Sequence, residues 1–232
     1  MLTHGDLNVV ILAYSRVDTF ERVIRECEKK LNHIKVVMDF PENDLVSKRQ
    51  QEMIKIIDDL KINCTLRRRQ ENYGLVKSVL TTIKEELENN EHIVLLEDDC
   101  LPTDGFFEYM SDSLIKHKDN KNISTVCGTI TKCRFNPWGW ATWSNKWNYQ
   151  QLSKDEILKI SDLDIDLRGF LENNNVENSI WSLSWLANQY KNNTNSIFPE
   201  HNLIQNIGLD ESGVHSHKKG YTNWLLSQIK EK

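Results

Sequence analysis

Apolar residues in the first 127 positions alternate between short continuous runs and stripes with helical spacing. The runs predict strands covered on both faces, and they lie at 8–14, 34–38, 62–66, 92–96 and 123–127. Amphipathic stripes between them predict helices at about 18–31, over a polar segment carrying Met53 to Leu60, and at 75–87 and 105–116. Repeated βα units of this length predict an α/β fold with a mostly parallel central sheet and helices on both faces.

The second part of the chain has a different character. Six of the seven tryptophans lie between residues 138 and 185, and no Gly/Ser-rich or Pro-rich linker separates the two parts. We therefore expect a single domain over 1–232, with one half at 1–127 and an elaborated, Trp-rich half at 128–232.

Composition narrows the class of protein. Hydrophobic residues make up 39% of the 232 residues, which is enough for a packed core, and no apolar run is long enough for a transmembrane helix. The net charge of −5 disfavours a protein that binds nucleic acid by neutralising phosphates. The start of the chain has no signal-peptide pattern, and the five scattered cysteines contain no CxxC pair. These features favour the cytoplasm, with at most peripheral association with the inner face of a membrane.

An acidic triplet, Glu97-Asp98-Asp99, directly follows the run HIVLL. Ligands of parallel α/β sheets bind outside the carboxyl ends of the strands, and adjacent carboxylates there repel one another. A hard divalent cation such as Mg²⁺ or Mn²⁺ resolves that repulsion and neutralises a diphosphate. The alternative is a solvated acidic turn in which Asp99 or Asp104 caps the next helix.

Three other strand ends carry polar residues. Ala13-Tyr14-Ser15-Arg16 follows the first strand, where Arg16 can contact phosphate and Tyr14 can stack on a base; the alternative is a helix-entry loop capped by Ser15 or Asp18. Asp39 ends the second strand and is either a base or ribose ligand or a turn residue. The segment from Arg67 to Leu75 is an anion site beside a helix start or a solvated basic loop.

The segment 136–143, NPWGWATW, concentrates aromatic residues. Such a cluster either walls a pocket for a sugar or base or belongs to the core. Trp140, Trp143 and Trp147 follow helical spacing, so at least two of them are expected to be buried. The chain contains no GxGxxG, Walker A, GxSxG or HExxH motif, and the pair His215 and His217 is weak as a metal site.

Four motifs in order resemble the GT-A glycosyltransferases. They are NVVILAYSR, VVMDF, ENYGL and HIVLLEDDCLPTDGFFEYM, and they are most similar to the branch around N-acetylglucosaminyltransferase I and its bacterial relatives, in which an acidic triplet replaces Asp-x-Asp. NPWGWATWSNKW and the stretch from Trp181 to Ser216 resemble the family's C-terminal half. The resemblance covers residues 8 to about 217 and implies a GT-A fold, with 1–127 as the nucleotide-binding half and 128–232 as the donor-sugar and acceptor half.

The resemblance also implies roles for individual residues. The nucleotide would be bound by Ala13, Tyr14, Ser15, Arg16, Asp39, Asn72 and Asp98, with Arg16 near the diphosphate and Asp39 on the base. Asp99 would bind the metal, Mn²⁺ or Mg²⁺. Trp138, Gly139 and Trp140 would shape the donor or acceptor pocket.

The expected catalytic base is missing. Inverting relatives carry an acid just after the first tryptophan of the Trp-rich helix, whereas Ser182 follows Trp181 here. A serine does not accept the acceptor's proton at neutral pH without help. Glu211, Asp210 and Glu177 are the replacement candidates, and a retaining or inactive protein is the alternative.

The sequence therefore predicts a metal-dependent glycosyltransferase of hexosyltransferase type. It would move a sugar from a nucleotide-diphosphate sugar, UDP-linked by expectation, to a glycan or lipid-linked glycan in bacterial surface polysaccharide synthesis. One alternative is a sugar nucleotidyltransferase, although such enzymes usually have a glycine-rich basic loop after the first strand and LAYSRVDTF has no glycine. The other is a catalytically inactive nucleotide-binding module.

Overall fold

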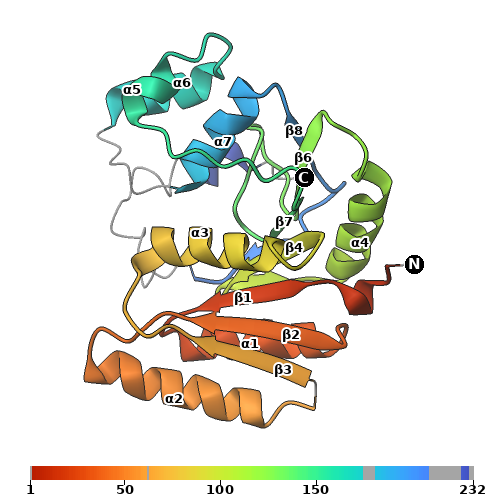
Figure 1. The fold of residues 1–232 in the computed structure, drawn as a ribbon, viewed down its shortest axis with the longest axis vertical. Coiled ribbons are helices and arrows are strands. Elements are labelled where there is room, and N and C mark those ends of the chain that lie inside the picture. The colour runs from red at the N-terminus through yellow and green to blue at the C-terminus, as the bar shows by residue number, and fades with distance from the viewer. Residues whose placement is uncertain (1, 62, 175–180, 209–225, 230–232) are drawn as a thin grey trace.

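A computed structural model of the chain describes residues 2–61, 63–174, 181–208 and 226–229 (Figure 1). The strands are β1 (Val9–Ala13), β2 (His33–Met38), β3 (Asn63–Arg68), β4 (His92–Glu97), β5 (Cys100–Pro102), β6 (Ile123–Cys127), β7 (Trp140–Trp143), β8 (Asn195–Ile197) and β9 (Ile204–Asn206). The helices are η1 (His4–Asp6), α1 (Val17–Glu28), α2 (Asp44–Asp58), α3 (Gly74–Leu87), α4 (Phe106–His117), α5 (Lys154–Leu158), α6 (Ile165–Asn173) and α7 (Trp181–Lys191). Within these ranges, no helix combines the length and apolar character needed to cross a membrane.

A seven-stranded sheet in the order β3-β2-β1-β4-β7-β6-β8 forms the centre of the molecule. The first four strands in this order are parallel. β7 is antiparallel to both of its neighbours, and β8 pairs in parallel with β6. The expected α/β fold with a mostly parallel sheet is therefore confirmed.

Helices cover both faces of the sheet. Successive residues of a strand point to opposite faces, so apolar residues on both faces need a packing layer on each side. Val9 and Ile11 point to the face packed by apolar residues of α1, α2 and α4. Val10 and Leu12 point to the opposite face, packed by α3, α5, α6 and α7. Because β1 is buried on both faces along its whole length, its sequence is a continuous apolar run.

The tryptophan segment departs from its expected local structure. Trp140 and Trp143 belong to a strand, β7, and not to a helix, so the helical spacing was misleading. Both are buried as expected, but on opposite faces of the sheet: Trp140 packs with the α3 side and Trp143 with the α4 side. The β-sheet pairing of β7 between β4 and β6 outweighs the local periodicity.

A second difference concerns the start of α1. Neither Ser15 nor Asp18 caps this helix; the N-cap position is Arg16, and it makes no side-chain capping hydrogen bond. The Arg16 side chain is thereby left available for contacts beyond its own helix.

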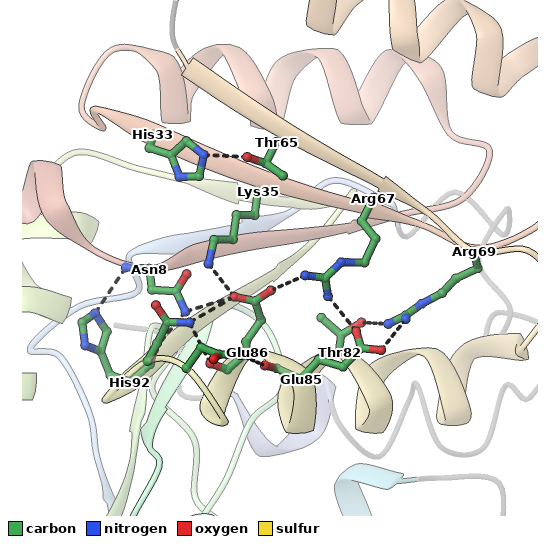
Figure 2. Close-up of polar contacts among 12 residues, drawn as sticks. Asn8, His33, Lys35, Thr65, Arg67, Arg69, Thr82, Glu85, Glu86 and His92 are labelled. Carbon is green, nitrogen blue, oxygen red and sulfur yellow. Dashed lines mark hydrogen bonds and ion pairs between the residues drawn. The ribbon is translucent and has the colours of Figure 1, made fainter.

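An ion network fastens α3 to β2 and β3 (Figure 2). Glu86, 2% exposed, accepts hydrogen bonds from Lys35 on β2 and Arg67 on β3. Glu85, one residue earlier on α3, accepts from Arg67 and Arg69. In the basic segment expected as an anion site or a solvated loop, Arg67 and Arg69 instead form ion pairs with the carboxylates of α3. This pairing fixes the helix whose first turn lies beside Asp39.

Candidate functional site

The candidate site lies at the carboxyl edge of three adjacent parallel strands. β1, β2 and β4 end at Ala13, Met38 and Glu97, and the registers place Ala13 beside Met38 and Leu12 beside Glu97. The residues that follow each strand therefore meet at one edge of the sheet, which is where such folds bind ligands.

Arg16 joins the strand ends of β1 and β4. Its Nε lies 3.4 Å from Asp98 Oδ1, and its Nη1 is paired with Asp99 Oδ2. The backbone N–H of Tyr14 also donates to Asp98 Oδ2 at 3.1 Å. Asp98 and Asp99 are 4% and 6% exposed, so the expected strand-end residues form one buried, charge-paired cluster.

The small antiparallel sheet of β5 and β9 covers this cluster. Cys100 pairs with Asn206, and the N–H of Ile207 donates to the carbonyl of Asp99 at 2.8 Å. This brings Gly208 so close that a Cβ at this position would lie 2.6 Å from Asp99 Cβ and would collide with Arg16. Only glycine fits here, because any side chain would push apart the Arg16–Asp99 pair.

The cluster shifts the acidities of its members. Burial, and next the repulsion of Asp99, raises the pKa of Glu97 to about 8. Burial also raises the pKa of Asp98 to about 6, although Arg16 opposes that shift. Burial alone would lower the pKa of Arg16, but the two carboxylates outweigh it and raise that pKa, so Arg16 remains fully charged.

Asp39, at the end of β2, is tied to the first turn of α3. Its carboxylate accepts hydrogen bonds from the backbone N–H groups of Tyr73, at 2.9 Å, and Gly74, at 2.8 Å. Asn72 reaches over the same edge and donates to the carbonyl of Phe40 and to the Tyr14 hydroxyl. Tyr14, Asp39 and Asn72 are thus brought together, with the Phe40 side chain 44% exposed beside them.

Gln50 is a site residue that the sequence reasoning missed. Its amide nitrogen donates to the carbonyls of Tyr14, at 3.1 Å, and Asp39, at 2.9 Å, and it is fully buried. The signal was present, because Gln50 stands on the same stripe of α2 as Val46, Met53 and Ile57. A polar residue in a core stripe needs hydrogen-bond partners; the amide nitrogen of Gln50 finds them at the ends of β1 and β2, whereas its buried amide oxygen has none among the described residues.

The aromatic segment contributes mainly to the core. Trp140 is fully buried and lies within 5.6 Å of Trp181 and 5.1 Å of Phe135, centroid to centroid. Gly139 has a positive φ of 59° and packs its backbone against Ile204. Trp138 is partly buried and contacts both cores. Of these three residues, Trp138 has the accessible surface that a ligand contact needs.

The candidate bases Glu177, Asp210 and Glu211, like His215 and His217, lie outside the described residues. Ser182, which stands in the place of the family's acid, is buried within α7 at 5% exposure. The identity of a base therefore stays a prediction.

The acidic residues at the end of β4, as they are placed, do not form a site for a divalent cation. In the described part of the chain, no group of three or more His, Cys, Asp or Glu side chains is arranged to hold a metal ion. Asp98 and Asp99 already face Arg16, and Gly208 closes the space next to Asp99. The carboxylate chemistry suits a hard cation, but this arrangement does not fit one, and Asp99 stays a metal ligand by prediction only.

Comparisons with known proteins were made for the sequence and for the fold. Neither the protein-family models nor the curated proteins gave a match. Among solved structures, a 4-diphosphocytidyl-2C-methyl-D-erythritol synthase from Anaerococcus prevotii matches with a TM-score of 0.47 and 10% identity, covering 87% of this chain and 92% of that one. A cytidylyltransferase from Leptospira borgpetersenii matches with a TM-score of 0.46 and 15% identity, covering 84% and 77%. An inositol-1-phosphate CTP transferase from T. maritima gives 0.35 and 11%, covering 60% and 69%.

This comparison corrects the function expected from the sequence resemblance. The three structures are named as a synthase, a cytidylyltransferase and a CTP transferase, and none of the three is named a glycosyltransferase. We therefore withdraw the glycosyltransferase interpretation and its hexosyl transfer. The physical reason is that the resembling motifs describe strand ends and core aromatics, which belong to the fold and do not fix the reaction. At such low identity these likenesses concern the fold only, so function is argued below from the site.

Proposed function

We propose that the chain binds a nucleoside triphosphate at the carboxyl edge of β1, β2 and β4 and transfers its nucleotidyl group to a sugar phosphate. The acceptor's phosphate oxygen attacks the α-phosphorus, the bond between the α- and β-phosphates breaks, and pyrophosphate leaves. The product is a nucleotide-diphosphate sugar. Such chemistry depends mainly on positioning the reactants and on positive charge near the phosphates.

The observation that carries the proposal is the placement of Arg16. Its guanidinium joins the ends of β1 and β4, and the Arg16 side chain is 20% exposed, so part of it is accessible to a ligand. Arginine binds phosphate through paired N–H donors. LAYSRVDTF has no glycine-rich loop to supply backbone N–H groups, so in this chain the phosphate contact falls to Arg16.

The neighbouring strand end supplies the groups for the nucleoside. The Tyr14 hydroxyl and the Phe40 carbonyl both accept hydrogen bonds from Asn72, and Phe40, the exposed residue after Asp39, adds an aromatic side chain to this edge. Aromatic rings stack on any base, and such contacts are worth about 1–3 kcal/mol each. The Asp39 carboxylate already accepts from the backbone N–H groups of Phe40, Tyr73 and Gly74, so its part is to hold the end of β2 and the start of α3 in place beside the nucleoside. These residues support a nucleoside site directly next to Arg16.

The test is release of pyrophosphate. The full chain is incubated with each of the common nucleoside triphosphates together with a panel of sugar 1-phosphates. The expected result is pyrophosphate and a nucleotide sugar with at least one pair of substrates, and loss of this activity in Arg16→Met. Arg25→Met, which removes an exposed arginine paired with Glu21 on α1, is the matched control and keeps the activity. Absence of pyrophosphate with every pair would refute the transferase proposal.

A nucleotide-binding module without turnover is the second candidate. The specific observation in its favour is that the Arg16 guanidinium is already paired with Asp98 and Asp99, so its positive charge is compensated before any ligand binds. Binding of a triphosphate that depends on Arg16, with no pyrophosphate from any acceptor, is the result that distinguishes this candidate from the enzyme.

A further inference from the structure

Two adjacent carboxylates, those of Asp98 and Asp99, are buried at the end of β4. Two negative charges side by side away from water are costly unless a positive charge compensates them. In the described ranges, Arg16 is the one cation within salt-bridge distance of either carboxylate, and it reaches both. The stability of this strand end therefore depends on that guanidinium.

The surrounding residues crowd Asp99 on the side that faces Gly208 and Cys100. Ile207 N–H is hydrogen-bonded to the carbonyl of Asp99, and Gly208 lies against both Asp99 and Arg16. The Cys100 thiol lies 3.5 Å from the other oxygen, Asp99 Oδ1. On this side of Asp99, a divalent ion with its coordinated waters does not fit unless Gly208 and Arg16 move.

We infer that Arg16 is the internal cation of this site, so that Arg16 and a divalent cation exclude one another as partners of Asp98 and Asp99. This statement concerns the protein without nucleotide and goes beyond the proposed function. An ion that enters must displace the guanidinium and move Gly208 away. Arg16 thereby sets how strongly the protein binds metal.

The experiment measures Mn²⁺ binding to the full chain without nucleotide, by electron paramagnetic resonance of the free ion. The parent protein is expected to bind weakly, with a Kd above about 1 mM. Arg16→Met frees the carboxylates and should bind at least about tenfold more tightly. Arg25→Met serves as the matched control and should bind like the parent. Adding Asp99→Asn to Arg16→Met should abolish the gain.

Folding is followed in the same variants. Arg16→Met leaves two buried carboxylates uncompensated, so its melting temperature should be lower than that of the parent. Adding Mn²⁺ should raise the melting temperature of Arg16→Met and leave that of the parent unchanged. Arg16→Lys keeps a charge but lacks the planar fork that reaches both carboxylates; it should fold and show a smaller gain in Mn²⁺ affinity. This second variant keeps the test decisive if Arg16→Met does not fold.

Two results would overturn the inference. One is tight Mn²⁺ binding by the parent, with a Kd below about 100 µM, because Arg16 would then not block the ion. The other is a set of folded Arg16 variants that bind Mn²⁺ no better than the parent. Failure of nucleotide binding would refute the proposed function and leave this inference standing, so the two are tested separately.

Discussion

Asp39 shows how a single carboxylate joins two elements at the edge of the sheet. It follows β2, and it accepts hydrogen bonds from the first N–H groups of α3 at Tyr73 and Gly74. The first N–H groups of a helix have no partner within the helix, and a carboxylate there also complements the helix dipole. The residue thus has a structural role whether or not it also contacts a nucleoside.

We predict that Asp39→Ala lowers the free energy of unfolding by about 2 kcal/mol, because the backbone N–H groups of Phe40, Tyr73 and Gly74 lose a buried carboxylate acceptor. Urea denaturation measures the change. The control is Asp58→Ala, which removes an exposed carboxylate at the last residue of α2. This control should leave the midpoint of urea unfolding nearly unchanged. Equal midpoints for Asp39→Ala and the parent would show that these hydrogen bonds do not hold the helix start.

Glu97 gives the molecule a pH dependence of defined sign. Burial first, and the Asp99 charge second, raises its pKa to about 8 from an ordinary 4.5. Between these values the folded protein holds a proton that the unfolded chain has released, so stability falls as the pH rises. Asp98, with a pKa of about 6, adds to the same slope at its lower end.

We expect the urea midpoint to decrease steadily from about pH 5 to about pH 8, since the folded state binds more protons over this interval. Glu97→Gln removes one titrating group and should flatten the profile. Glu21→Gln changes a carboxylate on the surface of α1 and should preserve the slope. A midpoint that rises with pH in this interval would contradict the assigned acidities.

At the scale of elements, α3 depends on ion pairs for its position. The Glu86 carboxylate accepts hydrogen bonds from Lys35 on β2, from Arg67 on β3 and from Asn8, the residue before β1 (Figure 2). The Glu86 side chain is 3% exposed, so water cannot replace these partners. Lys35 and Arg67 are 24% and 41% exposed and keep part of their hydration without Glu86, so the cost of removing this buried carboxylate is expected at the lower end of that for breaking a buried pair.

Glu86→Ala should therefore destabilise the fold by about 3 kcal/mol. Glu21→Ala breaks an exposed pair with Arg25 and should cost no more than about 0.5 kcal/mol. Both values come from urea unfolding at a pH where the carboxylates are ionised. If the two variants lose the same stability, the network in Figure 2 contributes no more than a surface salt bridge.

The elements differ in how well their sequences define them. The strand β1 is buried along its whole length and β4 is buried except at its two end residues, so their apolar runs predict them closely; β4 ends one residue later than expected, at Glu97. The segment of Trp140 and Trp143 was misread because three tryptophans happened to follow helical spacing. Its structure depends on pairing with residues such as Leu95 and Cys127, which are far away in the sequence and invisible to a local pattern.

At the scale of the whole molecule, the parallel sheet explains which site residues could be predicted. Strand ends must meet at one edge, so Tyr14, Arg16, Asp39 and Asp98 could be placed together from the sequence alone. The Arg16–Asp99 pair and the cover by Gly208 could not, because they depend on β9 returning beside β5. The division at residue 127, the roles of the site residues and the catalytic base stay predictions.

The central claim is that the strand ends around Arg16 bind a nucleoside triphosphate, and isothermal titration calorimetry measures this most directly. Each common nucleoside triphosphate is titrated into the parent, Arg16→Met and Arg25→Met. The account predicts saturable binding of at least one of them to the parent and to Arg25→Met, weakened at least about tenfold in Arg16→Met. Binding that is equally strong in Arg16→Met, or no binding of any triphosphate to the parent, would contradict it.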